Sequence, residues 1–316
     1  MQGYSINGYL NAVRRRSAKT LMVEGITDSS VITRLKRSLG AATGQEPPGN
    51  VDLPGVLTDE NLKGLGKREI VRRVLAAATS LAEKSPEIKR KFGTLQDREW
   101  DGLDLTLGLD ALWMPPNQDC PHFVTVGHSI ENYFFKVEII DAYLRFSHSN
   151  DLNQGFFNDL HQRFGKIIIL AAIYSIGVQS IFSIGKAGSL LTRGCVAWDG
   201  TKYTLTDALL PLLAQRGILH PARFLEDLNE QIQNSATDLA TIEVPRWLCH
   251  GHLGEDAVWA CVANLAREHN VSNEVAQSVE RGSRDVRFKH ASDYLSREEP
   301  TKISPLGDAV DWLTKP

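Results

Sequence analysis

The sequence predicts an α/β protein in which a mostly parallel sheet is flanked by helices and joined to a largely helical additional domain. The run Thr20–Val23 is short, apolar and partly β-branched, which is typical of a strand buried on both faces of a parallel sheet. Helical spacing of apolar residues dominates the rest of the chain. With 316 residues, 42% hydrophobic and 23% charged, the chain is long enough to bury a substantial core.

The first strand leads into a helix through a short turn that contains a carboxylate. Glu24 follows the strand directly, and Gly25 permits a tight turn. Thr27 or Asp28 can cap a helix with apolar residues at positions 31, 32 and 35. Glu24 is therefore expected at the carboxyl end of a strand, where open α/β sheets bind ligands.

Further elements follow in chain order. We expect a helix over 64–83, a strand over 123–126, a helix over 137–146, a buried central helix within 156–191, a strand over 241–244, a helix around 258–265, and a surface-wrapping or frayed tail from Arg281 onward. Polar residues interrupt the apolar run 167–184, which favours a buried helix over a membrane span.

These elements predict three parts of the chain. Residues 1–145 are expected to form the α/β domain that carries Glu24, and 146–236 a largely helical insertion without a carboxylate cluster. Residues 237–316 are expected to return as a strand and helix that pack on the first domain. The apolar and aromatic insertion suits docking of a partner or formation of a homodimer in the active state.

A second acidic segment follows the first by about seventy residues. Asp97, Glu99 and Asp101 alternate by two, so in an extended stretch they project to one side. Carboxylates held that close repel each other unless a hard divalent cation such as Mg²⁺ or Mn²⁺ neutralises them. The alternative is a solvated acidic loop.

The order of strand, Glu-Gly turn, helix and distal Asp-x-Glu resembles a TOPRIM domain, the catalytic module of topoisomerases, bacterial primases and OLD-family nucleases. Ile130-Glu131-Asn132-Tyr133 resembles a signature of TOPRIM-like defence proteins, including the nuclease subunits of PARIS-type anti-phage systems. Trp247–His252 resembles the glycine-containing end of a late strand in that family. The resemblance covers about residues 15 to 255.

The resemblance implies a Mg²⁺-dependent nuclease that hydrolyses phosphodiester bonds with water and acts with a partner ABC-type ATPase. RNA, including transfer RNA, or DNA is the implied substrate. The implied metal ligands are Glu24, Asp97, Glu99, Asp101 and Glu131. Glu99 departs from the pattern, because aspartate is usual at its position and the longer side chain moves the carboxylate outward.

Three further residues are candidates for the site. Lys67 is a possible phosphate contact, although the sequence around it is not a nucleotide-binding loop, because Arg68 replaces the required Ser or Thr. His250 and His252 can steady a phosphate or a leaving group. The alternative for these histidines is a zinc site that they would build with Cys120, His122 and Cys249. The alternative to a nuclease is a catalytically weak adaptor that binds the ATPase.

Composition narrows the class of protein further. The net charge is −3, so the chain as a whole is not a polycation, although basic residues cluster in several runs such as Arg14–Arg16 and Lys89–Lys91. No apolar signal core precedes Thr20, and the four cysteines form no dense disulfide framework. We therefore expect a cytoplasmic protein with reduced thiols.

Overall fold

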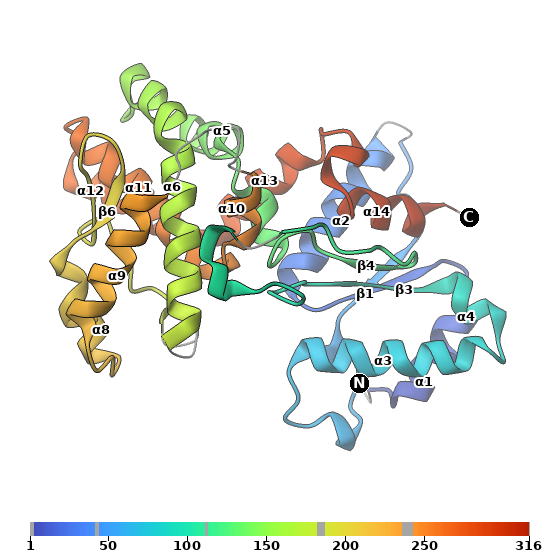
Figure 1. The fold of residues 1–316 in the computed structure, drawn as a ribbon. Coiled ribbons are helices and arrows are strands. Elements are labelled where there is room, and N and C mark those ends of the chain that lie inside the picture. The colour runs from blue at the N-terminus through green and yellow to red at the C-terminus, as the bar shows by residue number, and fades with distance from the viewer. Residues whose placement is uncertain (1–2, 42–43, 111–112, 182–186, 236–242, 316) are drawn as a thin grey trace. The chain divides into compact units, whose positions relative to one another are not determined.

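The computed structural model describes residues 3–41, 44–110, 113–181, 187–235 and 243–315 (Figure 1). The chain forms two compact units, which are described separately. The sheet unit consists of Met1–Arg98, Pro115–Val126 and Ser292–Pro316. The helical unit consists of Glu99–Met114 and Gly127–Ala291.

A four-stranded parallel sheet with the order β2-β1-β3-β4 is the centre of the sheet unit. Its strands are β1 (Thr20–Val23), β2 (Asn50–Asp52), β3 (Phe92–Gln96) and β4 (His122–Val124). All residues of β1 and β3 are buried. The parallel pairing of all four strands confirms the prediction of a parallel sheet. The run Thr20–Val23 is apolar because a strand of such a sheet is covered on both faces.

Helices cover both faces of this sheet, as Figure 1 shows. One face carries α1 (Ile6–Arg15), α3 (Lys67–Ala82) and α4 (Pro86–Lys91), and the other carries α2 (Ile26–Ala41) and α14 (Leu306–Thr314). Short 3₁₀ segments lie at Pro54–Val56, Glu60–Leu62 and Pro300–Ile303. The core under α1, α3 and α4 includes Tyr9, Val74 and Phe92. The helix expected over 64–83 is confirmed as α3.

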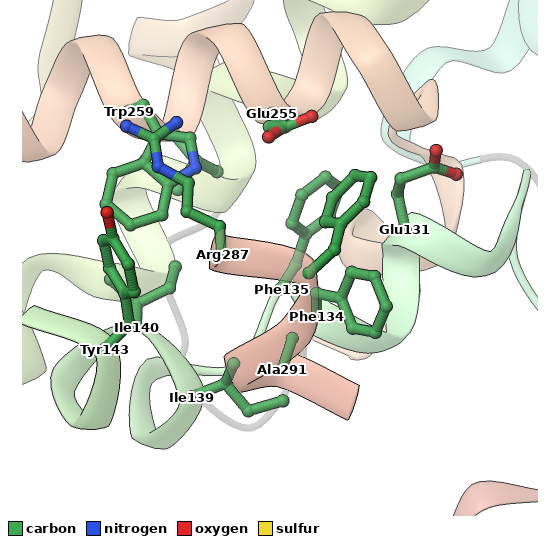
Figure 2. A pocket seen from close by; sticks show the side chains of 12 residues that line it. Glu131, Phe134, Phe135, Ile139, Ile140, Tyr143, Glu255, Trp259, Arg287 and Ala291 are labelled. Carbon is green, nitrogen blue, oxygen red and sulfur yellow. The ribbon is translucent and has the colours of Figure 1, made fainter. Parts of the chain in front are cut away.

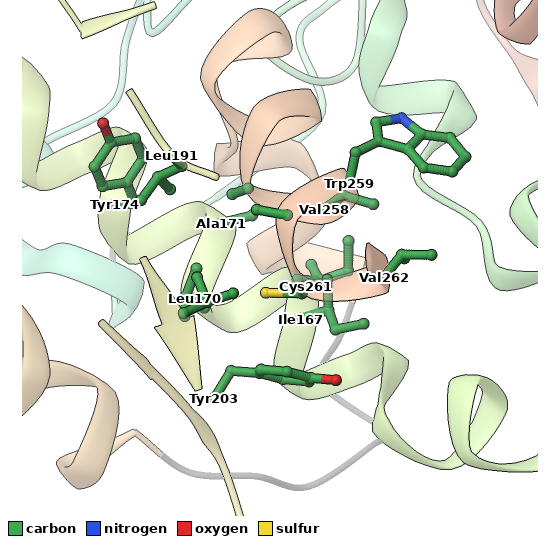
Figure 3. Packing of buried hydrophobic residues seen from close by; sticks show 14 of the residues in the cluster. Ile167, Leu170, Ala171, Tyr174, Leu191, Tyr203, Val258, Trp259, Cys261 and Val262 are labelled. Atoms are coloured by element: carbon green, nitrogen blue, oxygen red, sulfur yellow. The ribbon is translucent and has the colours of Figure 1, made fainter. Parts of the chain in front are cut away.

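The helical unit is built around two long helices that pack against each other, α6 (Gln154–Ile181) and α11 (Gly251–Glu268). Its other elements are η3 (Leu105–Asp110), η4 (Ile130–Phe134), α5 (Val137–Ser147), β5 (Val196–Trp198), β6 (Tyr203–Leu205), η5 (Asp207–Leu209), α8 (Leu210–Gln215), α9 (Pro221–Asn234), α10 (Glu243–Leu248), α12 (Asn273–Arg281) and α13 (Arg284–Leu295). The last four residues of α13 belong to the sheet unit. Figure 3 shows Ile167 and Leu170 of α6 beside Cys261 of α11. The expected buried central helix is confirmed, since Ile167–Ala172 are each at most 6% exposed. Among the described helices, none has the length and apolar character needed to cross a bilayer.

Two details of the helical unit differ from the sequence-based expectation. The strand expected over 241–244 is wrong where the structure describes it, because Glu243 and Val244 begin α10, and residues 241–242 lie outside the described residues. The helical turn buries Trp247 and Leu248 together, which an extended chain would point to opposite sides. In addition, the segment expected to be helical over 146–236 contains the antiparallel hairpin β5-β6.

The prediction that the chain from Arg281 onward wraps the surface or frays is also wrong. Leu306, Ala309, Val310 and Leu313 follow helical spacing and are each at most 3% exposed, and α14 packs against α2 and β1. Pro305 stands at the N-cap of α14, where a proline costs the helix no hydrogen bond. The C-terminus is therefore part of the core of the sheet unit.

The contacts divide the chain differently from the expected boundaries at 145 and 236. Residues Gly127–Ala291 form one compact unit, whereas the last residues of the chain return to the sheet. The division follows burial, because η4 and α5 share a core with α6 and α11 rather than with the sheet.

If α14 completes the core of the sheet unit, Leu313→Ala should lower the free energy of unfolding by about 2–5 kcal/mol. Leu313 is 1% exposed, so its truncation leaves a cavity. Urea denaturation measures the loss. Leu39→Ala is the matched control, because Leu39 is 45% exposed and its truncation should cost less than about 0.5 kcal/mol. Equal effects of the two substitutions would contradict a folded C-terminus.

Candidate functional site

Parallel pairing of β1 and β3 brings two of the predicted acidic residues together at the carboxyl edge of the sheet. Val23 is in register with Leu95, so Glu24 and Asp97 follow neighbouring strand ends. The backbone N–H of Asp97 donates a hydrogen bond to Glu24 Oε1 at 3.1 Å. Both residues are partly buried. The pair therefore lies where parallel α/β sheets bind their ligands.

Asp28 shapes the turn that holds Glu24. Its carboxylate accepts a hydrogen bond from the Gly25 N–H at 2.7 Å, and the Gly25 carbonyl accepts the first helical bond from Ser29. Asp28 is 7% exposed and lies in the first turn of α2. The negative charge also suits the positive end of the helix dipole. Asp28 thus fixes the β1-α2 turn, in agreement with its expected capping role.

The segment after Asp97 is held from two other elements of the sheet unit. The Arg98 N–H donates to Thr125 Oγ1 at 2.9 Å, and its guanidinium donates to the Val126 carbonyl at 3.3 Å. Arg68 Nη2 on α3 donates to the Arg98 carbonyl at 3.0 Å. The first turn of α3 therefore reaches the carboxyl edge, and Lys67, its first residue, is exposed there.

Glu99 and Asp101 do not form the extended, one-sided array that was expected with Asp97. Glu99 has a φ of 53° and Gly102 a φ of 76°, so the chain turns sharply after the strand. The Glu99 N–H donates to the His128 carbonyl at 2.7 Å, and both carboxylate residues are exposed members of the helical unit. The alternation by two was misleading because it applies only to extended backbone.

The donor set at the carboxyl edge can be compared with the needs of a divalent cation. Within the described ranges of the chain, no three His, Cys, Asp or Glu side chains form a group arranged to hold a metal. Mg²⁺, however, is usually held by one or two carboxylates, with waters and substrate phosphates completing its octahedron. An ionised carboxylate has about four acceptor positions, so the bond from Asp97 does not exclude a cation. As carboxylate residues that follow neighbouring strand ends, Glu24 and Asp97 offer the type of oxygen ligand that Mg²⁺ and Mn²⁺ require.

A second group of charged side chains lies in the helical unit around Arg284. Its guanidinium contacts Glu131 Oε1 at 3.0 Å and Glu255 Oε2 at 2.9 Å, and it also donates to His252 Nδ1. The carboxylates of Glu131 and Glu255 are 8% and 12% exposed. Figure 2 shows both carboxylates beside the apolar pocket lined by Phe134 and Phe135.

Glu131 is therefore held by an ion pair inside the helical unit. A close approach allows this arrangement, because a Cβ on Gly251 would lie 2.3 Å from Ser129 Oγ and 2.9 Å from Glu131 Oε2. Local sequence does not predict Arg284 as the partner of Glu131, because 153 residues separate the two. Arg287 of the same helix is buried over the Trp259 ring, 3.7 Å from its centroid.

The histidines lie at the start of a helix, not at the end of a late strand. His250 is the N-cap of α11, and its Nδ1 accepts a hydrogen bond from the Leu253 N–H at 3.4 Å. Its ring packs 4.3 Å from the His128 centroid, and burial lowers the pKa of His250 to about 4. His250 is thus neutral near pH 7 and acts as a cap.

Cys249 does not suit the alternative zinc site. Its thiol is fully buried and donates to the Pro245 carbonyl at 3.3 Å. Burial raises the pKa of Cys249 well above its usual range, whereas zinc binds the thiolate.

Comparison with known families found no family model that matches this chain, and comparison with curated proteins found no similar sequence.

The environment of Glu255 predicts a pH-dependent stability. Burial raises its pKa to about 7, and the neighbouring guanidiniums of Arg284 and Arg287 only partly oppose the rise. The folded state therefore binds more protons than the unfolded state between the ordinary pKa of 4.5 and about 7. The stability contributed by Glu255 is fully present below pH 4.5 and is lost as the pH rises through 7.

Glu255→Gln, which cannot ionise, should therefore gain stability relative to the parent as the pH rises from 5 to 7. The relative gain should not exceed about 1.4 kcal/mol per pH unit. Denaturant unfolding at several pH values measures it. Glu274→Gln, on the exposed face of α12, is the control and should run parallel to the parent. A constant difference between Glu255→Gln and the parent would show that Glu255 titrates at its ordinary pKa.

Proposed function

We propose that this chain is a Mg²⁺-dependent nuclease of the TOPRIM type, which hydrolyses phosphodiester bonds at the carboxyl edge of its parallel sheet. The observation that carries the proposal is the juxtaposition of Glu24 and Asp97 by the parallel pairing of β1 with β3. Strand, Glu-Gly turn, helix and a distal carboxylate at the neighbouring strand end are the arrangement on which the TOPRIM resemblance rests.

The residues of this edge divide the work of such a reaction. Glu24 and Asp97 would hold the cation, which, when bound, stabilises the charge that develops on the attacking and leaving oxygens. The turn fixed by Asp28 orients Glu24, and the bonds of Arg98 to Thr125 and Val126 orient Asp97. Lys67 supplies a cation that suits a substrate phosphate. Glu24 is the best-placed carboxylate to accept a proton from water.

The wider role follows from the resemblance. The nuclease would act as a toxic effector in anti-phage defence, with a partner ABC-type ATPase that restrains or delivers it, and as a homodimer when active. RNA, including transfer RNA, is the proposed substrate, with DNA as the alternative. Glu99 and Asp101 carry no part of this proposal, because the left-handed turn at Glu99 breaks the extended array that the sequence predicted.

A second candidate is a catalytically weak adaptor that binds the ATPase. One observation favours it: of the five predicted metal ligands, the sheet unit unites only Glu24 and Asp97, and the described part of the chain contains no three-ligand group. Metal binding and cleavage separate the adaptor from the nuclease.

Glu24→Gln should abolish Mg²⁺-dependent cleavage of transfer RNA or DNA and weaken Mn²⁺ binding at least tenfold. The substitution keeps the shape of the side chain and its acceptor for the Asp97 N–H but removes the charge that attracts the cation. Loss of a metal ligand removes several kcal/mol of transition-state stabilisation, which corresponds to orders of magnitude in rate. Calorimetry with Mn²⁺ and gel-based cleavage assays measure the two effects.

Glu60→Gln is the matched control, because Glu60 is an exposed glutamate of the same unit whose carboxylate pairs with Lys63. It should bind metal and cleave as the parent does. Cleavage by folded Glu24→Gln at the parental rate would refute the nuclease assignment. A parent that binds the ATPase but neither metal nor nucleic acid would establish the adaptor.

A further inference from the structure

One exposed face of α1 forms a groove with an aromatic end and a cationic end. Tyr4, Gly8, Asn11 and Arg15 recur at helical spacing, and together with Ala12, Arg14 and Arg16 they line an open groove. Gly8 and Ala12 have almost no side chain, so the floor of the groove is flat between Tyr4 and the arginines. Tyr4 is 45% exposed.

The aromatic end is rigidly positioned. The Tyr4 N–H donates to the Val56 carbonyl at 3.0 Å, and the Tyr4 carbonyl accepts from the Thr58 N–H at 2.9 Å. The ring also packs against Tyr9, with centroids 6.5 Å apart. An exposed ring on a fixed backbone presents a flat apolar surface at little entropic cost, which suits stacking of an unpaired base.

The cationic end gathers residues from two helices. Lys91 Nζ at the end of α4 donates to the carbonyls of Arg14 and Arg16 at the end of α1. This contact joins the end of α4, which carries Lys89 and Arg90, to the end of α1, which carries Arg14 and Arg15. All four side chains are exposed. Among the described residues none of these four makes an ion pair, whereas Arg16 pairs with Asp52 at 2.6 Å. Glu87, whose pKa is lowered chiefly by a backbone hydrogen bond and to a smaller extent by Arg90 and Arg14, is the carboxylate within this group.

The groove runs along the strand direction toward the edge that carries Glu24. Its cationic end lies at the amino edge of the sheet, because α4 leads directly into β3 and α1 is followed by β1. Its aromatic end pairs with Val56, which follows the carboxyl end of β2. The ten residues of α1 span about 15 Å, the length of about four nucleotides stacked at 3.4 Å.

The ordinary explanation of such cations is that they complement helix dipoles, since both α1 and α4 end here. Lys91 already serves that role, because it contacts the carbonyls of Arg14 and Arg16 at the end of α1. The helix dipole explains neither the small residues on the floor of the groove nor the exposed ring of Tyr4. A chain of regularly spaced phosphates with flat bases matches all three features.

We propose that this groove binds a single-stranded segment of polynucleotide, with phosphates on Arg14, Arg15, Lys89 and Arg90 and a base stacked on Tyr4. The choice of ligand rests on the proposed function, since the groove would lead a substrate toward Glu24. Binding itself needs no metal and no cleavage. The groove is therefore a substrate-holding surface separate from the two-carboxylate site.

The test uses the full chain and a fluorescein-labelled uridine 12-mer, with fluorescence anisotropy at 50 to 200 mM salt. Replacing Arg14, Arg15, Lys89 and Arg90 by Gln should weaken binding at least tenfold at 50 mM salt. It should also lower the slope of log affinity against log salt by as much as about 3, or 0.7 per lost phosphate contact. Tyr4→Ala should weaken binding about 5- to 150-fold without changing the slope, and Tyr4→Phe should bind as the parent does.

A second quadruple variant is the matched control. Lys63, Arg73, Lys302 and Lys315 each pair with a neighbouring carboxylate of the sheet unit, and replacing them by Gln changes the net charge equally. Binding by this control should stay within twofold of the parent. The proposal would be overturned if both quadruple variants lost affinity equally, or if the groove variant lost none. It would also be overturned if the same four cations bound phosphatidylserine vesicles more tightly than the oligonucleotide.

Failure of this surface and failure of the proposed nuclease have different signatures. Glu24→Gln should bind the 12-mer with parental affinity, because the carboxylate makes no part of the groove. A parent that binds the 12-mer through these residues but cleaves nothing would retain the groove and remove the nuclease. A groove variant that cleaves with the KM of the parent would retain the nuclease and remove the groove.

Discussion

The pairing of β1 with β3 is the constraint on which the rest of the sheet unit depends. Two strands separated by about seventy residues are joined in parallel, with Val23 opposite Leu95, and this register sets Glu24 beside Asp97. A shift of either strand by one residue would turn its side chains to the opposite face of the sheet and change the pairing of Glu24 with Asp97. The turn at Asp28 and the bonds of Arg98 serve the same end, because each fixes the backbone directly after one of these strands.

The helical unit follows a different principle, in which one guanidinium compensates two nearly buried carboxylates. The guanidinium of Arg284 lies 3.0 Å from Glu131 Oε1 and 2.9 Å from Glu255 Oε2. The guanidiniums of Arg284 and Arg287 do not fully offset the desolvation of Glu255, and burial therefore raises the pKa of this carboxyl group. Glu131, which motif resemblance assigns to metal binding, is thus held in an ion pair with a residue distant in sequence.

The sequence was most informative where local pattern and burial agree. The apolar run at Thr20–Val23, the helix α3 and the buried α6 follow from periodicity, and the strand end at Glu24 follows from the glycine after it. The pattern failed where backbone geometry or distant partners decide. No local sequence pattern predicts the left-handed φ of Glu99 or the pairing of Glu131 with Arg284. Pro300 and Pro305 obscured the helical spacing of α14, although a proline is compatible with the start of a helix.

Location of the cation tests the central claim most directly. Crystals of the full chain grown with Mn²⁺ would reveal the ion by its anomalous scattering. The account predicts one Mn²⁺ ion bound by carboxylate oxygens of both Glu24 and Asp97 at about 2.1 Å, close to the distances of hard octahedral ions. An ion bound elsewhere, or none at this edge at millimolar Mn²⁺ in protein that cleaves nucleic acid, would contradict it.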